Sequence, residues 1–122
     1  MGCVFEVGEE TVWHPASRVG ETYLALAGGL AGLVGVPTGI TATAADFHRV
    51  DIVQFDVFTK RVFAEYFRSG HELRRTMVDA VLRPSIVMLV RGGGRIEPAT
   101  EEQRLYLVEA GQLASAMPAQ RS

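Results

Sequence analysis

The residues best suited to chemistry stand at the start of the first predicted helix. His14, Arg18 and Glu21 recur at spacings of four and three, which places them on one face of the first two helical turns. With Trp13 before them, they offer an aromatic wall, an imidazole, a guanidinium and a carboxylate, a set that can bind a peptide and move a proton. The same residues also fit a structural role, in which His14 caps the helix and Arg18 pairs with Glu21 on the surface.

A second candidate group is the stretch D-F-H-R-V-D at positions 46–51. Asp46, His48 and Asp51 surround the aromatic Phe47 in a segment without clear periodicity, which suits the rim of a pocket. The alternative is a solvated loop that is anchored by Phe47, with Asp51 as the cap of the next helix. These four residues form a candidate substrate-binding set together with Phe5, Glu10, Trp13 and Tyr23, while His14, Arg18 and Glu21 form the candidate catalytic set.

The sequence contains no familiar catalytic or metal-binding signature. The glycines at 92–94 are not followed by the lysine and Ser/Thr of a phosphate-binding loop, and the three histidines lack the spacing of metal ligands. Cys3 is the single cysteine, which excludes an intramolecular disulfide and a cysteine metal cluster. We therefore predict no metal site.

Composition and charge indicate a single globular domain spanning residues 1–122. The chain is 48% hydrophobic and 21% charged, and a net charge of -2 with a pI near 5.9 argues against a nucleic-acid-binding surface. The uncharged stretch 22–45 is interrupted by Pro37, and its apolar part is shorter than the roughly 20 residues of a membrane-spanning helix. The N-terminus does not resemble a signal peptide. These features predict a cytoplasmic protein without a membrane segment.

The hydrophobic periodicity predicts a mainly α-helical fold with a short N-terminal β-hairpin. Alternating residues indicate the hairpin, and apolar residues at spacings of three and four indicate about four helices. Capping-box patterns begin at Ser69 and Thr100, and Pro84 predicts a kink or a break. Residues 40–50 lack a clear period and have room for a short helical turn at 42–45. The predicted elements are the hairpin at 3–13 and helices at 15–35, 51–67, 70–91 (kinked at Pro84) and 100–117.

Glycines are concentrated in the first predicted helix. Gly28, Gly29, Gly32 and Gly35 lie in or at the end of it, and each interior glycine costs ~1 kcal/mol relative to alanine. Several in one helix indicate that something approaches its backbone closely: another helix, a second copy of the chain or a ligand. We expect a homodimer. Gly35 or Gly39 suits the left-handed turn that ends the helix.

Two segments carry a family resemblance. The stretches F-E-V-G-E-E-T-V-W-H-P-A-S-R-V-G (5–20) and G-V-P-T-G-I (35–40) resemble a family of small, mostly uncharacterised proteins from high-GC bacteria. The size and helical outline are also similar to the lysinoalanine-forming enzymes of cinnamycin- and duramycin-type lanthipeptide pathways. That resemblance implies a cofactor-free helical homodimer whose partner is a modified precursor peptide with thioether rings. It also implies a reaction that joins a lysine to a dehydroalanine, with the substrate's own hydroxylated aspartate handling the proton.

The implied reaction assigns tasks that several residues of this chain can perform. Arg18 can donate to the dehydroalanine amide oxygen as negative charge develops, or hold a substrate carboxylate. His14 or His48 can shuttle a proton. Because holding two parts of one peptide together can contribute ~7–11 kcal/mol, such an enzyme needs no catalytic triad. The alternatives are a non-catalytic helical binding module, such as an immunity or adaptor protein, and a structural homodimer.

Overall fold

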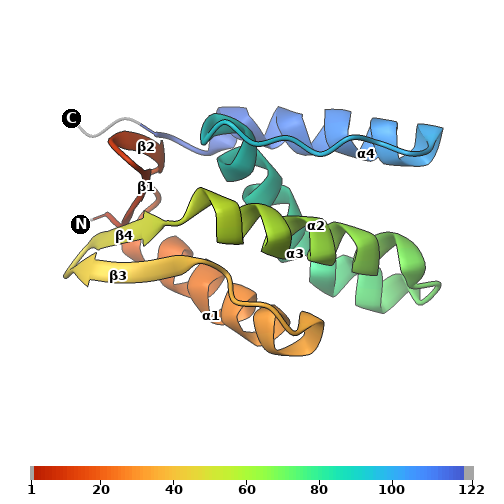
Figure 1. Ribbon diagram of the computed structural model, residues 1–122, viewed down its shortest axis with the longest axis horizontal. Coiled ribbons are helices and arrows are strands. Elements are labelled where there is room, and N and C mark those ends of the chain that lie inside the picture. Colours follow the sequence, from red (N-terminus) through yellow and green to blue (C-terminus); the bar gives the residue numbers. More distant parts are fainter. Residues whose placement is uncertain (1, 120–122) are drawn as a thin grey trace.

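The computed structural model describes residues 2–119 and contains four helices and four short strands. Figure 1 shows the strands gathered at one end of the molecule, with the helices extending away from them. The elements follow the chain in the order β1 (Val4–Val7), β2 (Glu10–Trp13), α1 (Ser17–Val34), β3 (Ile40–Ala44), β4 (Phe47–Val50), α2 (Ile52–Arg68), α3 (Glu72–Arg91), α4 (Glu101–Gln112) and the 3₁₀ turn η1 (Leu113–Ala116). The predicted predominance of helix and the N-terminal hairpin are confirmed.

The strands form one sheet in the order β2-β1-β4-β3, which is larger than the predicted hairpin. β1 pairs with β2 and β3 with β4 in antiparallel fashion, whereas β1 and β4 are parallel, with Val4 opposite Phe47. The prediction of an irregular 40–50 segment with a helical turn at 42–45 was therefore wrong. A two-stranded hairpin alone is marginally stable, and here each hairpin supports the other through the central parallel pair.

The helices lie close to their predicted positions, with differences at the ends. α3 runs without a break through Pro84, so the predicted alternative of two shorter helices was wrong. The capping box expected at Ser69 does not form, because His71 caps α3 by accepting the Arg74 N–H at 3.4 Å. The cap at Thr100 is confirmed, since its hydroxyl accepts the Gln103 N–H at 3.1 Å. The last helix is shorter than predicted: α4 ends at residue 112 and η1 follows.

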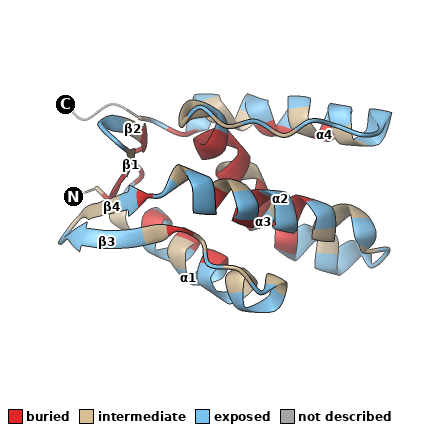
Figure 2. Cartoon of the chain, viewed as in Figure 1, coloured by how far each residue is buried: buried red, intermediate tan, exposed pale blue. Residues whose placement is uncertain are grey.

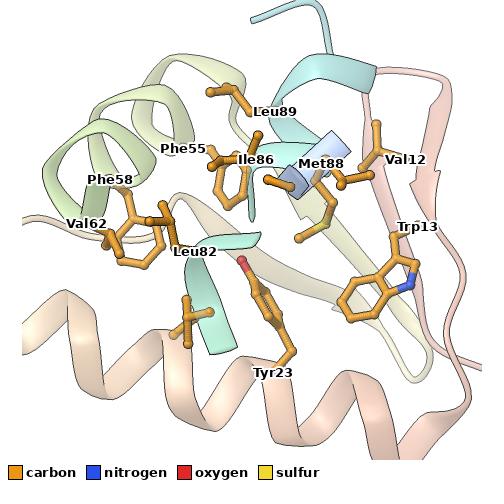
Figure 3. Packing of buried hydrophobic residues seen from close by; sticks show 14 of the residues in the cluster. Val12, Trp13, Tyr23, Phe55, Phe58, Val62, Leu82, Ile86, Met88 and Leu89 are labelled. Atoms are coloured by element: carbon orange, nitrogen blue, oxygen red, sulfur yellow. The ribbon is translucent and has the colours of Figure 1, made fainter. Parts of the chain in front are cut away.

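The core lies where α2 and α3 meet the sheet and α1. Figure 2 shows that burial is concentrated in the C-terminal half of α3 and on the inward faces of α1 and α2. Phe55 and Phe58 of α2 pack here with Leu82 and Met88 of α3, and all four are completely buried (Figure 3). Burying side chains of this size contributes roughly 1.5–3 kcal/mol each, which fixes α3 as the central helix.

The glycines of α1 do not pack as expected within the chain. A Cβ atom added at Gly28, Gly29 or Gly32 would meet nothing within 4 Å. The close intrachain approach occurs instead at Gly20, where such an atom would lie 2.8 Å from the Cys3 Cβ atom. Of the alternatives left open for these glycines, a close partner within the described chain is not found at Gly28, Gly29 or Gly32, and the homodimer stays a prediction. Gly35 does supply the left-handed C-cap, with φ of 76°.

No helix within residues 2–119 combines the length and the apolar character that crossing a bilayer requires.

Candidate functional site

An open groove of about 510 Å³ lies between α1, α3 and the segment around η1. We call it the α1–α3 groove. Its walls are mostly apolar, and they come from parts of the chain that are far apart in sequence. The residues that line it are Trp13 from β2, Arg18, Val19, Thr22, Tyr23 and Leu26 from α1, Ala80 and Pro84 from α3, and Leu113, Ala116 and Met117 from the C-terminal segment.

Stacked rings support the Trp13 side of the groove from within. Phe5 lies opposite both Trp13 and His48 in the sheet register, so the three rings form a row across β2, β1 and β4. The ring centroids are 5.4 Å apart for Phe5 and Trp13 and 5.2 Å apart for Phe5 and His48. Tyr23 packs edge-on against Phe5 and Trp13. Aromatic pairs contribute ~0.5–1.5 kcal/mol beyond their burial, so this wall is preorganised.

Tyr23 is fixed at its hydroxyl end as well. Figure 3 shows the side chain rising from α1 beside Trp13, and its oxygen lies 2.7 Å from the Ser85 Oγ atom. Ser85 donates to the Val81 carbonyl oxygen at 2.7 Å, so the Tyr23 hydroxyl is the donor to Ser85. Burial raises the pKa of Tyr23 above its ordinary value. The phenol is therefore neutral and acts as part of the wall, not as a base.

Among the described residues that line the groove, Arg18 is the only cationic side chain. It is exposed, and within residues 2–119 its guanidinium makes no ion pair, side-chain hydrogen bond or ring contact. The predicted surface pair between Arg18 and Glu21 is not formed. The surrounding helix start is also positive in character, because Ala16 at the N-cap makes no side-chain cap and the first turn has no acidic residue. This end of the groove favours an anion.

Arg91 braces the far side of the groove, a role that the sequence analysis missed. Its guanidinium donates to three carbonyl oxygens: Val12 at 2.9 Å, Met117 at 2.8 Å and Ala114 at 3.0 Å. These bonds tie β2 to the C-terminal segment beside Trp13. The local signal was only a basic residue in the last turn of α3, which commonly pairs with the helix dipole.

Three of the predicted residues, His48, Asp46 and Glu21, lie near Cys3. The Cys3 Sγ atom lies 3.3 Å from the His48 Nδ1 atom. Burial raises the pKa of Cys3, and the negative charges of Asp46 and Glu21 raise it further. A reactive thiolate needs an electropositive, accessible setting, which is the reverse of this one. The Cys3 thiol is therefore un-ionised, and its contact with His48 is structural.

The other candidates also lie outside the groove lining. Half-buried His14 donates its backbone N–H to the Pro118 carbonyl oxygen at 2.6 Å. Asp51 caps α2 by accepting the N–H groups of Val53 and Gln54, which matches its structural alternative. Glu10 is exposed at the start of β2, and Phe47 is half-buried in β4. Of the eleven predicted site residues, the groove brings together Trp13, Arg18 and Tyr23, and fully buried Phe5 backs them.

A second group of aromatic and charged residues lies between α3 and α4. We call Asp79, Arg83, Tyr106 and Glu109 the α3–α4 cluster. Arg83 donates to both carboxylate oxygens of Asp79 at 2.8 and 3.0 Å and contacts Glu109 at 3.3 Å, and its guanidinium lies 4.8 Å from the Tyr106 ring centre. The Tyr106 hydroxyl donates to Asp79. Burial, with the Asp79 carboxylate next, raises the pKa of Tyr106.

Within the described part of the chain, no group of three or more His, Cys, Asp or Glu residues is placed to hold a metal ion.

Comparison with known families gives one assignment. A family model described as a family of unknown function, DUF6086, matches residues 1–119. The chain belongs to this family. No curated protein and no solved structure matches the chain. The description of this family names neither a lanthipeptide nor a lysinoalanine enzyme.

Proposed function

We propose that this protein binds an acidic peptide segment in the α1–α3 groove. The observation that carries the proposal is the unpaired Arg18 guanidinium on an otherwise apolar groove. Ligand sites are typically concave and apolar, with a few polar groups that fix orientation. Here the apolar walls bind side chains, and Arg18 binds a carboxylate in a charge-assisted hydrogen bond.

The groove shape supports an elongated ligand. Val19, Thr22 and Leu26 follow one another along α1 at helical spacing, and Ala80 and Pro84 lie one turn apart on α3. Val19 is 53% exposed and Leu26 is 49% exposed, so apolar surface remains uncovered along the α1 wall. A peptide segment lying between these two helices covers that surface while its acidic group reaches Arg18.

Selection from a displayed library of random peptides about a dozen residues long tests the proposal. We expect the wild type to enrich peptides that combine Asp or Glu with apolar residues, and we expect Thr22→Trp, which fills the groove, to abolish that enrichment. Thr76→Trp is the matched control, because both threonines are exposed and donate to the carbonyl oxygen four residues earlier. Equal enrichment by all three proteins contradicts the groove as the site.

A charge test uses the selected peptides. Arg18→Gln should weaken their binding about tenfold or more, since hydrogen bonds to charged groups are worth ~1.5–3 kcal/mol. Arg104→Gln on α4 is the control, because that exposed arginine lies outside the groove. Equal affinity of the two variants for acidic peptides would show that Arg18 does not bind the carboxylate.

A second candidate, lysinoalanine formation, uses the same groove for catalysis. The favouring observation is again the combination of Arg18 with apolar walls. A free lysine amine has a pKa of ~10.4, and both desolvation and a neighbouring positive charge lower it, which yields the neutral nucleophile. Addition forms a bond from the amine nitrogen to the alkene carbon and returns the lost proton to the neighbouring carbon. Arg18 stabilises the developing charge on the amide oxygen.

The catalytic candidate has its own assay. A dehydrated, thioether-bridged and hydroxylated precursor peptide is incubated with the protein, and the remaining alkene is trapped with a thiol. Ring closure adds no mass, so we expect protein-dependent loss of thiol addition, and Arg18→Gln should slow that loss while Arg104→Gln should not. If the alkene stays equally reactive with and without protein, lysinoalanine formation is wrong and peptide binding is judged by the library alone.

A further inference from the structure

Pro84 interrupts the hydrogen bonding of α3 at the place where the helix lines the α1–α3 groove. Proline has no backbone N–H, so the carbonyl oxygen of Ala80, four residues earlier, lacks its regular helical donor. No side chain within residues 2–119 donates to this oxygen either. The adjacent carbonyl differs, because Val81 accepts an additional bond from the Ser85 hydroxyl at 2.7 Å. The Ala80 oxygen is therefore an acceptor that lacks its regular helical partner.

Ala80 and Pro84 lie on the groove wall and not in the core. Ala80 is exposed and Pro84 is half-buried, and both line the groove. Helical carbonyl groups point toward the C-terminal end of the helix, so the Ala80 oxygen is directed toward the Pro84 ring on that wall. On the opposite wall, the Thr22 hydroxyl already donates to the Arg18 carbonyl oxygen. The groove therefore offers charged donors on α1 and a backbone acceptor on α3.

The presence of both a cationic donor and a backbone acceptor distinguishes between kinds of ligand that carry an apolar part and a negative charge. A fatty acid satisfies the apolar walls and the Arg18 guanidinium but has no donor for the Ala80 oxygen. A peptide satisfies all three, because every residue except proline has a backbone N–H. We infer that the Ala80 carbonyl anchors one backbone N–H of the acidic peptide, an inference that rests on the proposed peptide binding. Pro84 is then the positioning residue that keeps this acceptor free.

The test couples one change in the protein to one change in the ligand. A peptide selected from the random library is N-methylated at each backbone amide in turn, and its affinity is measured for wild type and Pro84→Ala. Alanine at this position restores the helical donor and occupies the Ala80 oxygen. We expect methylation of one amide to cost about threefold to tenfold in wild type and almost nothing in Pro84→Ala. The other amides should behave alike in both proteins.

A second measurement requires no variant. The carbonyl carbons of Ala80 and Val81 are labelled with carbon-13, and the selected peptide or a saturated fatty acid is added to wild type. We expect the Ala80 signal to shift with the peptide and not with the fatty acid, while Val81 changes little because its oxygen already accepts the Ser85 bond.

The outcomes separate the inference from the proposal beneath it. Peptides that require an open groove, yet show no methylation site that depends on Pro84 and no Ala80 shift, overturn the anchor and leave peptide binding intact. A library that yields no peptide sensitive to Thr22→Trp overturns both. A fatty acid that binds more tightly than any peptide and shifts the Ala80 signal equally also overturns the anchor.

Discussion

The α1–α3 groove and the α3–α4 cluster contain similar residues in different roles. Each contains an arginine and aromatic side chains beside α3. Arg83 contacts two carboxylates and a ring, whereas Arg18 contacts none of these within the described residues. A satisfied cation fastens two helices together. An unsatisfied cation on an apolar concavity is available to a ligand. The difference shows that the partners of a residue, more than its type, separate a structural role from a binding role.

The largest expected difference is in the free energy of unfolding when arginine is replaced by glutamine in the α3–α4 cluster and in the α1–α3 groove. Arg83→Gln should lower the free energy of unfolding by about 2–3 kcal/mol, because it removes charge-assisted bonds and leaves Asp79 to a single tyrosine donor. Arg18→Gln should change it by less than about 0.5 kcal/mol. Urea unfolding of the two variants measures both values. Equal losses would mean that Arg18 has a structural role and would remove the contrast.

The brace at Arg91 connects stability to the groove itself. Arg91→Met should cost about 2 kcal/mol, since it removes three hydrogen bonds to backbone carbonyls and releases the C-terminal segment from β2. Trp13 is the sole tryptophan, so its fluorescence should move to longer wavelength as the wall loosens. Arg95→Met is the control, because that residue forms only an exposed pair with Glu97. An unchanged spectrum would show that the wall forms without the brace.

Alkaline pH should weaken both regions through their tyrosines. The pKa values of Tyr23 and Tyr106 are raised in the folded protein, while unfolded phenols ionise near pH 10. The unfolded state therefore binds fewer protons above about pH 10, and the stability present below that pH is lost as pH rises. Each phenol should contribute a slope of about 1.4 kcal/mol per pH unit. Urea unfolding above pH 10 should show that the free energy of unfolding falls less steeply with pH in Tyr23→Phe and Tyr106→Phe than in wild type. If neither substitution changes this slope, the result is inconsistent with neutral buried phenols.

The smallest expected effect tests the exposed surface of α1 at Gly32. Gly32→Ala should raise the free energy of unfolding by about 1 kcal/mol, because the helix gains propensity and the new methyl group meets nothing within 4 Å. Gly20→Ala is the contrasting control and should be destabilising, since its methyl group would collide with Cys3. Thermal unfolding and mass in solution decide the matter. A dimer that dissociates with Gly32→Ala would instead indicate that a second copy covers this surface.

The features that the sequence predicted correctly are those determined by hydrophobic periodicity and by the capping residues at helix ends. Four helices, the first hairpin and the cap at Thr100 follow from residue spacing and from the short polar side chain at a helix start. The second hairpin was missed because Thr-Ala-Thr-Ala carries little apolar alternation, and its pairing with β1 depends on residues distant in sequence. The Ser69 pattern failed because His71 provided a competing cap two residues later.

The candidate site was predicted only in part, for a similar reason. Trp13, Arg18 and Tyr23 are close in sequence and fall at one end of a helix, so local reasoning found them. The opposite wall comes from α3 and the C-terminal segment, and no spacing rule connects those residues to α1. Pro84 was interpreted by its effect on the helix, although its missing N–H also leaves an acceptor exposed in the groove.

The parallel pairing of β1 with β4 determines when the sheet can be completed during synthesis. Val4 is synthesised before Val50, so the strand that it borders is not complete until the whole of α1 has been added. At roughly 5–20 residues per second, the N-terminal hairpin waits on the order of several seconds for its neighbour. During that interval β1 presents an open edge and α1 has no finished sheet to pack against. The exposure of this edge therefore lasts as long as synthesis takes to reach residues 40–50.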